Sequence, residues 1–304
     1  MQIESAKKIA IVFPGQGSQK IGMLAEFAEK HTTVKTTFDE ASTVLGYDLW
    51  DLVQNDPNNK LNQTEYTQVA MLAADIAAWR VWCEQNQQIP SYLAGHSLGE
   101  YAALVAAESL DFKDAITLVS NRGRLMQAAV PDGIGGMAAI IGLDNKKISQ
   151  LCDAARENEA LSPANFNSIG QTVIAGNLTA IKRAVVLSKE YGAKLAKVLP
   201  MSVPSHCELL KDAALEFAKI LQKTEIKIPS MPVIHNHDLK IHTDPNDIRN
   251  ALVKQLYNPV RWVETIEFFV KEGISEIVEM GPGTVLTGLN KRITKLVPTV
   301  NFVD

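Results

Sequence analysis

The segment Gly95–Gly99, which reads Gly-His-Ser-Leu-Gly, constrains the fold more than any other part of the chain. A short apolar run, Tyr92–Ala94, precedes it, and strong helix formers follow it. Between a strand and a helix, G-x-S-x-G is typical of a nucleophile elbow, a sharp turn that presents a serine. The flanking glycines leave room for a strained backbone, and the helix N-terminus favours developing negative charge. The pattern therefore predicts that Ser97 is a nucleophile for acyl transfer.

The composition bounds the class of protein. The chain has 304 residues, of which 46% are hydrophobic and 21% charged, as in a globular protein with a sizeable core. A net charge of −4 argues against a broad surface for nucleic acid or anionic membranes. The few, widely spaced cysteines form neither a disulfide framework nor a zinc spacing. The apolar run Ile9–Phe13 is too short for a signal peptide or a membrane span, so we expect a cytoplasmic protein.

Strands that lead into glycine-rich loops and helices recur near both ends of the chain. Ile9–Phe13 reads as a buried strand before the loop Pro14–Gln19, and Glu276–Met280 reads as a strand before Gly281–Gly283 and a helix. With the elbow, these units predict a mostly parallel α/β sheet whose site lies at the C-terminal strand ends. We assign residues 1–127 and 204–304 to this large domain.

Residues 128–203 show a different pattern, in which strands and helices alternate as β-α-β-β-α-β. This order is the split, ferredoxin-like arrangement, so we expect a small inserted subdomain of that kind. The expected elements are Met137–Ile141, Asn145–Glu157, Pro163–Asn167, Thr172–Ala175, Leu178–Tyr191 and Lys194–Leu199.

A nucleophilic serine needs a base, and His206 is the best placed of six histidines. It ends the loop Val203–His206, where the small subdomain returns to the large one, and domain junctions often hold active sites. The neighbouring Cys207 is expected to be a buried, inert thiol. The other histidines are expected at the surface, pointing away from Ser97, or in a polar segment where an i, i+2 pair is a weak metal candidate. These are His31, His96, His235, His237 and His242.

Arg122 is a charged residue on an apolar helix stripe. The helix begins after Asp111, and Arg122 falls in its i, i+3, i+4, i+7 apolar pattern, whereas Arg124 shares a face with polar residues. A buried guanidinium stays charged and needs an anion, and Gly123 leaves space for close approach. Two interpretations follow: a salt bridge to a buried Asp or Glu, or a planar fork that binds a carboxylate of the substrate.

The first glycine-rich loop contains Gly15-Gln16-Gly17, which invites a dinucleotide-binding interpretation. The third glycine of that fingerprint should stand at position 20, which is Lys20, so the interpretation is weak. This loop converges on the same sheet edge as the elbow. An oxyanion donor from the loop, complementing the backbone N–H of Leu98, fits the pattern better.

Together these segments resemble the bacterial malonyl-CoA:acyl carrier protein transacylases over nearly the whole chain. One departure is Val69, where the family usually has proline, but this position touches no catalytic role. The matching motifs occur in the family's order and spacing: Phe13–Gln19, Gly95–Tyr101, Arg122-Gly123, Asn165–Ser168, Val203–His206, Gln255–Val260 and Gly281–Gly283.

The resemblance implies an α/β-hydrolase-like large domain with a ferredoxin-like insert. It implies Ser97 as the nucleophile, His206 as the base and Arg122 as the ligand of the malonyl carboxylate. It also implies an oxyanion hole made by the backbone N–H groups of Gln16 and Leu98.

The family orients its histidine with a backbone carbonyl rather than with an aspartate, and Gln255 matches that position. The implied reaction moves a malonyl group from malonyl-CoA to the phosphopantetheine thiol of holo acyl carrier protein, for fatty acid elongation. The implied enzyme uses no cofactor and no metal, binds neither nucleic acid nor membrane, and is expected to be a monomer.

Other function classes are considered beside this one. A serine hydrolase would use the same dyad with water as acceptor, but a carboxylate-binding arginine argues against a lipase-like role. An inactive carrier-protein scaffold would not need intact catalytic residues. Because acyl carrier proteins are acidic, a basic patch is expected near the cleft, with these candidates: Lys182, Arg183, Lys189, Lys291, Arg292 and Lys295.

Overall fold

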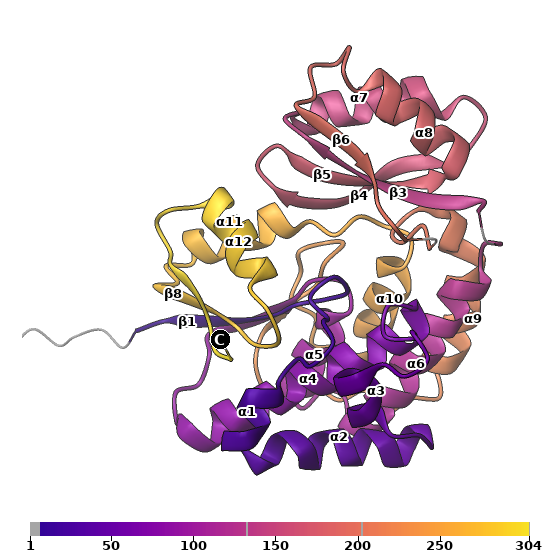
Figure 1. Cartoon of the computed structure of the whole chain (residues 1–304). Coiled ribbons are helices and arrows are strands. Elements are labelled where there is room, and N and C mark those ends of the chain that lie inside the picture. The colour runs from indigo at the N-terminus through magenta and orange to yellow at the C-terminus, as the bar shows by residue number, and fades with distance from the viewer. Residues whose placement is uncertain (1–6, 132, 202, 304) are drawn as a thin grey trace, which may run out of the picture.

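The computed structural model describes residues 7–131, 133–201 and 203–303, which form an α/β fold with a parallel sheet and a separate antiparallel sheet (Figure 1). The parallel sheet has the strand order β7-β2-β1-β8-β9. Its C-terminal strand ends therefore share one edge, as the sequence predicted. The strands are β1 (Ile9–Phe13), β2 (Tyr92–Gly95), β7 (Val233–Ile234), β8 (Glu276–Glu279) and β9 (Thr299–Asn301).

Helices cover both faces of the parallel sheet. Because successive side chains of a strand point to opposite faces, those of β1 are buried in two different cores. Ile9, Ile11 and Phe13 face the larger core, and Ala10 and Val12 face the smaller one. The larger core takes residues from α1 (Ala25–Lys30), α2 (Thr32–Leu45), α3 (Leu49–Asn55), α4 (Thr64–Gln85), α5 (Gly99–Ala106), α6 (Phe112–Ala128), α9 (Lys211–Leu221) and α10 (Pro245–Gln255). The smaller core takes them from α11 (Trp262–Lys271) and α12 (Val285–Ile293).

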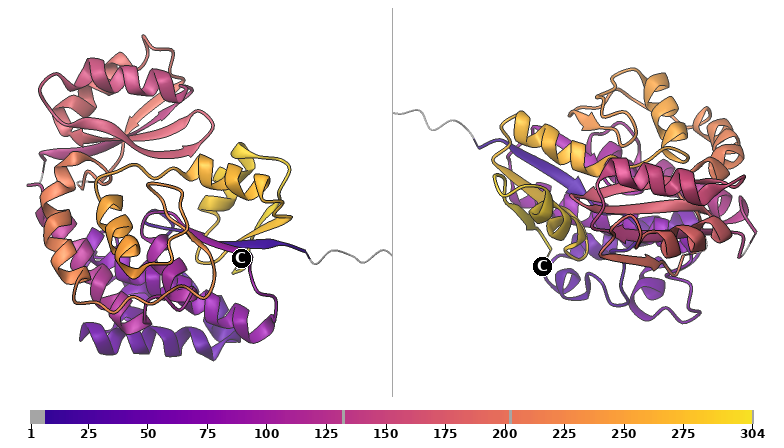
Figure 2. Two further views of the ribbon diagram at one scale, coloured as in Figure 1. Left: turned by 180° about the vertical axis from the view of Figure 1, so that it is seen from behind. Right: turned by 90° about the horizontal axis from the view of Figure 1, so that it is seen from above.

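The antiparallel sheet has the strand order β4-β5-β3-β6, and α7 and α8 pack on its outer face. Figure 1 and the left view of Figure 2 show it stacked over the large body. The predicted order β-α-β-β-α-β is confirmed, although α8 ends at Leu187 rather than Tyr191, before a turn at Gly192. The elements are β3 (Gly135–Ile141), α7 (Asn145–Arg156), β4 (Leu161–Ser168), β5 (Gln171–Asn177), α8 (Leu178–Leu187) and β6 (Leu195–Val198).

Strand β4 fastens the small sheet to the large body. The Phe166 N–H donates to the Val260 carbonyl at 2.9 Å, and the Val260 N–H donates to the Ala164 carbonyl at 2.9 Å. These two hydrogen bonds form an isolated parallel β-bridge between Asn165 and Val260, which fixes β4 beside the segment that leads into α11. The asparagines of β4 are held against the elbow, where His96 Nε2 donates to Asn167 Oδ1 at 2.8 Å.

The helices of the described segments do not include one that could cross a membrane. Even α4, with 22 residues, lacks the continuous apolar length that a span requires.

The smaller core, which α11 and α12 form with the sheet, gives a stability prediction. Phe269 of α11 is fully buried in the smaller core, whereas the adjacent Phe268 is only partly buried. We expect Phe269→Ala to lower the free energy of unfolding by about 3–5 kcal/mol, because it leaves a cavity. The matched Phe268→Ala should cost clearly less. Urea unfolding followed by circular dichroism measures both, and equal losses would contradict the assigned packing.

Candidate active site

Ser97 occupies a sharp turn between β2 and α5, with φ at 52° in the left-handed region. The turn is possible only because its neighbours are glycines. A Cβ at Gly95 would collide with the backbone of Gly99, and a Cβ at Gly99 would collide with the carbonyl of Phe13. The predicted strand, elbow and helix are therefore confirmed as local structure.

Asn236 holds this turn from the outside. The Ser97 N–H donates to Asn236 Oδ1 at 2.7 Å, and Asn236 Nδ2 donates to the Gly95 carbonyl at 2.6 Å. The side chain is 1% exposed, so it satisfies two buried backbone groups that the turn leaves without partners. Sequence reasoning missed this residue, because it lies in a polar segment that read as a strand end.

The structure brings Ser97 and His206 together across the domain junction. Ser97 Oγ lies 2.8 Å from His206 Nε2, and His206 Nδ1 lies 2.7 Å from the backbone carbonyl of Gln255. Since a carbonyl can only accept, Nδ1 carries the hydrogen and Nε2 is left to accept the serine hydroxyl proton. The geometry is that of a nucleophile beside an oriented base.

The surroundings of His206 keep its ring neutral. The side chain is 2% exposed, and burial, followed by the charge of Arg122, lowers its pKa to about 3. At neutral pH the imidazole is therefore unprotonated and available as a base.

Arg122 is buried beside this pair, at 1% exposure. Its Nη1 donates to Gln68 Oε1 at 2.8 Å, its Nη2 donates to Gln255 Oε1 at 2.9 Å, and Nη2 also lies 3.4 Å from Ser97 Oγ. Within the described ranges it makes no ion pair with a carboxylate, so the salt-bridge interpretation does not hold there. A guanidinium with amide partners keeps its positive charge free for an incoming anion.

Close packing of α6 on α4 sets this position. A Cβ at Gly123 would lie 2.8 Å from Glu65 Cα, which confirms that Gly123 permits the helices to approach. Arg124, two residues further along, lies on the exposed side of the helix and donates to Asn121. The predicted difference between the two arginines is confirmed.

The first glycine-rich loop lies against the elbow. A Cβ at Gly15 would collide with the carbonyl of His96 and would stand 3.7 Å from the backbone nitrogen of Leu98. Gln16 follows in the same loop, with its side chain 3.4 Å from Thr64 Oγ1. The backbone of this loop thus lies close to the backbone of the elbow at His96 and Leu98.

A cavity of about 580 Å³ opens above these residues, between the two sheets. It is lined from below by the residues that the sequence singled out and from above by asparagines and apolar side chains of the small sheet. A polar floor with a partly apolar roof suits a small acyl group on a larger carrier. The lining includes Gln16, Gln68, Ser97, Leu98, Arg122, Met137, Asn165, Asn167, Val173, Leu199, Met201 and His206.

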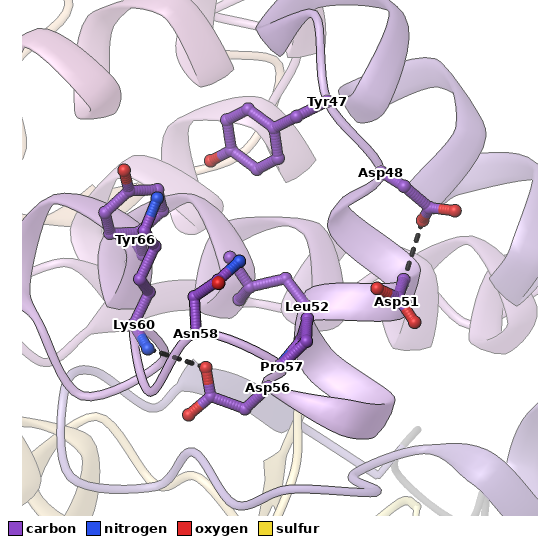
Figure 3. A pocket seen from close by; sticks show the side chains of 9 residues that line it. All are labelled: Tyr47, Asp48, Asp51, Leu52, Asp56, Pro57, Asn58, Lys60 and Tyr66. Carbon is purple, nitrogen blue, oxygen red and sulfur yellow. Dashed lines mark hydrogen bonds between the residues drawn. The ribbon is translucent and has the colours of Figure 1, made fainter.

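Figure 3 shows a separate cavity of about 280 Å³ beside α3. Its carboxylates already cap local backbone: Asp48 accepts from the Asp51 N–H at 2.8 Å, and Asp56 accepts from the Lys60 N–H at 2.6 Å. The Lys60 ammonium lies 4.9 Å from the centre of the Tyr66 ring. These contacts stabilise a helix start and a loop, and they present no nucleophile beside a base.

The other residues considered from the sequence as a nucleophile or as metal ligands make contacts that stabilise the structure. Cys207 Sγ donates to the Pro204 carbonyl at 3.1 Å, and burial raises its pKa to about 12, so it is an inert thiol. His235 Nδ1 donates to Glu100 Oε1 at 2.7 Å, and His242 Nε2 lies 2.9 Å from Asp238 Oδ2. Over the described ranges, no cluster of three or more His, Cys, Asp or Glu side chains could hold a metal ion.

The basic residues proposed for an acidic partner do not form one patch. Those of α8 lie on the outer side of the small sheet, and there Arg183 pairs with Glu159 at 2.5 Å. Arg292 of α12 instead donates to Gln171 Oε1 at 2.7 Å, at the border of the two sheets.

Sequence reasoning missed the buried polar residues that support the site. Gln68, Glu100 and Asn236 are each at most 1% exposed and contact Arg122, Gln255 or Ser97. Glu100 offered one signal, because it is a carboxylate at the start of an otherwise apolar helix. Gln255 was predicted for its carbonyl, and the structure adds the contacts of its side-chain amide.

Comparison with known proteins places this geometry in a family. The model of the acyl transferase domain matches residues 10–297. The malonyl CoA-acyl carrier protein transacylase of Haemophilus influenzae is 55% identical over 98% of this chain and 96% of its own length. That of Salmonella typhimurium is 53% identical over 94% of this chain and 93% of its own length.

Solved structures agree. An acyl carrier protein S-malonyltransferase from Vibrio cholerae has a TM-score of 0.95 and 57% identity, covering 97% of this chain and 96% of that one. A malonyl-transacylase solved in complex with its type II PKS acyl-carrier protein has a TM-score of 0.95 and 53% identity, covering 97% and 95%. The chain therefore belongs to the acyl transferase domain family and, within it, to the malonyl CoA-acyl carrier protein transacylases.

Proposed function

We propose that this protein transfers a malonyl group from malonyl-CoA to the phosphopantetheine thiol of acyl carrier protein, through a malonyl ester on Ser97. The observation that carries the proposal is the contact of Ser97 Oγ with both His206 Nε2, at 2.8 Å, and Arg122 Nη2, at 3.4 Å. A nucleophile, a base and a cation that pairs with no carboxylate of the described residues, all within one cavity, suit an acyl group that ends in a carboxylate.

In the first half-reaction, Ser97 Oγ attacks the thioester carbonyl carbon while its proton moves to His206 Nε2. The carbonyl oxygen becomes an oxyanion, which we assign to the backbone N–H groups of Gln16 and Leu98. The carbon–sulfur bond then breaks, coenzyme A leaves as a thiol with the proton from His206, and the malonyl carboxylate stays on Arg122.

In the second half-reaction, the phosphopantetheine thiol gives its proton to His206 and attacks the ester. The bond to Ser97 Oγ breaks, and the serine recovers the proton. The backbone carbonyl of Gln255 keeps the His206 ring oriented in both halves and can stabilise the imidazolium that forms. Because the second substrate enters after the first product leaves, the kinetics should be ping-pong.

The same interpretation covers the finer predictions made from the sequence. We interpret the large body as α/β-hydrolase-like, formed by residues 1–127 and 204–304, and the insert 128–203 as ferredoxin-like; the element order β-α-β-β-α-β supports the latter. The proposed cycle needs no cofactor and no metal, since malonyl-CoA is a substrate. A cytoplasmic monomer that binds neither nucleic acid nor membrane stays a prediction.

Intact-protein mass spectrometry after brief mixing with malonyl-CoA tests the function. We expect the mass to increase by one malonyl group, no increase in Ser97→Ala, and loss of the adduct when holo acyl carrier protein is added. An adduct that decays equally fast without carrier protein would instead indicate a thioesterase. Absence of any adduct in the wild-type protein would contradict the proposed cycle.

The carboxylate role of Arg122 predicts selective damage. Arg122→Ala removes a charge-assisted contact worth about 1.5–3 kcal/mol, so kcat/KM for malonyl-CoA should fall roughly 10- to 150-fold. Acetyl-CoA lacks the carboxylate and should be affected much less. Arg124→Ala, on the exposed side of the same helix, is the matched control. Equal losses for the two acyl groups would argue against this role.

The lowered pKa of His206 predicts a flat pH profile. Burial holds this pKa near about 3, so the ring should stay unprotonated and kcat/KM for serine acylation should change little from about pH 8 to about pH 5. A histidine with the ordinary pKa of about 6.5 would lose roughly tenfold per pH unit below that value. Stopped-flow release of coenzyme A measures the profile, and an inflection near pH 6.5 would overturn the expectation.

The same shift has a sign for stability. Between the ordinary histidine pKa of about 6.5 and the folded-state pKa of about 3, His206 is protonated in the unfolded chain but not in the folded chain. The free energy of unfolding therefore falls as the pH is lowered through this range. His206→Gln removes this contribution, so its urea midpoint should fall less steeply with pH than that of the wild-type protein.

A further inference from the structure

Glu100 is a buried carboxylate one turn beyond the nucleophile, and its exposure is 0%. Among the described residues its contacts are His235 Nδ1, at 2.7 Å from Oε1, and the Asn236 N–H and Gln255 Nε2, which donate to Oε2 at 3.0 Å and 2.9 Å. Oε2 thus accepts two N–H hydrogens, and Oε1 accepts a third when His235 carries its hydrogen on Nδ1. An ionised carboxylate can act as the acceptor in all three contacts.

This carboxylate fixes the orientation of the Gln255 amide. Gln255 Nε2 donates to Glu100 Oε2 at 2.9 Å and to the Ser97 carbonyl at 2.8 Å, and both of these groups can only accept. The amide nitrogen must therefore face them, which leaves Gln255 Oε1 to accept from Arg122 Nη2 at 2.9 Å. Glu100, Gln255 and Arg122 form one chain of hydrogen bonds that ends beside Ser97 Oγ.

In this chain of hydrogen bonds, the Gln255 amide stands between the carboxylate of Glu100 and the guanidinium of Arg122. Arg122 contacts the amide oxygens of Gln68 and Gln255, and no carboxylate of the described segments pairs with it directly. Burial lowers the pKa of the Arg122 guanidinium, and the nearby Tyr101 and Glu100 side chains oppose this shift through space. The cation is thus balanced enough to be buried and yet keeps donor capacity for a substrate.

We propose that Glu100 is a positioning residue that moderates the grip of Arg122 on the acyl carboxylate, so that the acyl group binds selectively and is still released. The proposal rests on the proposed function and adds a residue that sets its specificity. A carboxylate bound to Arg122 is attracted by the guanidinium and repelled by Glu100 from behind the Gln255 amide. The repulsion is weaker because it acts over a longer distance.

A moderate affinity for the carboxylate suits an acyl group that is transferred twice in each cycle, first from coenzyme A to Ser97 and then from Ser97 to the carrier thiol. A cation without a nearby anion would hold the malonyl ester and the malonyl product too tightly. A cation in a direct salt bridge would have no preference for a carboxylate at all. The observed spacing lies between these limits.

Glu100→Gln tests the charge while keeping the shape. Its amide oxygen can still accept from the Asn236 and Gln255 N–H groups, and its NH₂ group would face His235 Nδ1. His235 can adapt by carrying its hydrogen on Nε2, an atom without a partner among the described side chains. We expect KM for malonyl-CoA to fall on the order of tenfold, with a lower kcat for transfer to carrier protein and little change in acylation by acetyl-CoA.

The double variant Glu100→Gln/Gln68→Glu moves the anion into direct contact with Arg122. Gln68 Oε1 already accepts from Arg122 Nη1, and its Nε2 makes only a weak contact with Met126 Sδ at 3.4 Å. The total buried charge is kept, so the double variant remains testable even if Glu100→Gln alone does not fold. Here the preference for malonyl over acetyl should fall below that of the wild-type protein, in the direction opposite to Glu100→Gln.

Glu279→Gln is the control for simple loss of a buried carboxylate. Glu279 is also fully buried, and it accepts from the Leu286 and Thr287 N–H groups at the start of α12, away from Arg122. It should lower the melting temperature and leave the malonyl-to-acetyl ratio unchanged. A merely structural role of Glu100 would give this same result.

The wild-type protein is measured first, by Ser97 acylation with each acyl-CoA. Failure to form malonyl-Ser97 would contradict the proposed function itself. If wild-type acylation is normal but folded Glu100→Gln shows an unchanged or lower malonyl-to-acetyl ratio, the role of Glu100 is overturned. A double variant with the wild-type ratio would overturn it equally. Opposite shifts in the two variants would support it.

Discussion

The site depends on the close crossing of backbone at the elbow. Gly95 and Gly99 touch where β2 turns into α5, and Gly99 also packs on the carbonyl that ends β1. No side chain fits at either position, so the crossing ties the nucleophile to the centre of the parallel sheet. Ser97 is left in a left-handed conformation, and Asn236 satisfies the backbone groups that this conformation exposes. The strain is thus held by glycine packing on one side and an amide on the other.

Amide groups also organise the electrostatics of the site. Arg122 is buried among the side-chain oxygens of Gln68 and Gln255, and His206 is oriented by a backbone carbonyl. Neutral acceptors fix these positions without cancelling the positive charge. An aspartate in either place would pair with the cation or compete with an incoming carboxylate. The arrangement keeps the positive charge of Arg122 available to a ligand in the cavity.

Much of this could be predicted from sequence. The continuous apolar run of β1, the cap at Asp111 and the elbow glycines are local signals, and the structure has strand, helix and turn where they predict them. Arg122 was predicted as buried because a cation interrupts an apolar helical stripe. The short strands β7 and β9 carry too few residues for a pattern. Glu100, Gln68 and Asn236 were missed because their partners are distant in the chain, and a polar residue alone does not reveal burial.

The order of the chain has a consequence for biosynthesis. The nucleophile precedes its base by 109 positions, and the amide that orients the site lies 158 positions after the nucleophile. The central strand β1 pairs with β2 and with β8, which is translated long after both. A chain emerging from the ribosome therefore carries its serine long before anything can activate it. Reactivity appears only when the last third of the polypeptide closes the sheet, so incomplete chains should be inert toward acyl thioesters.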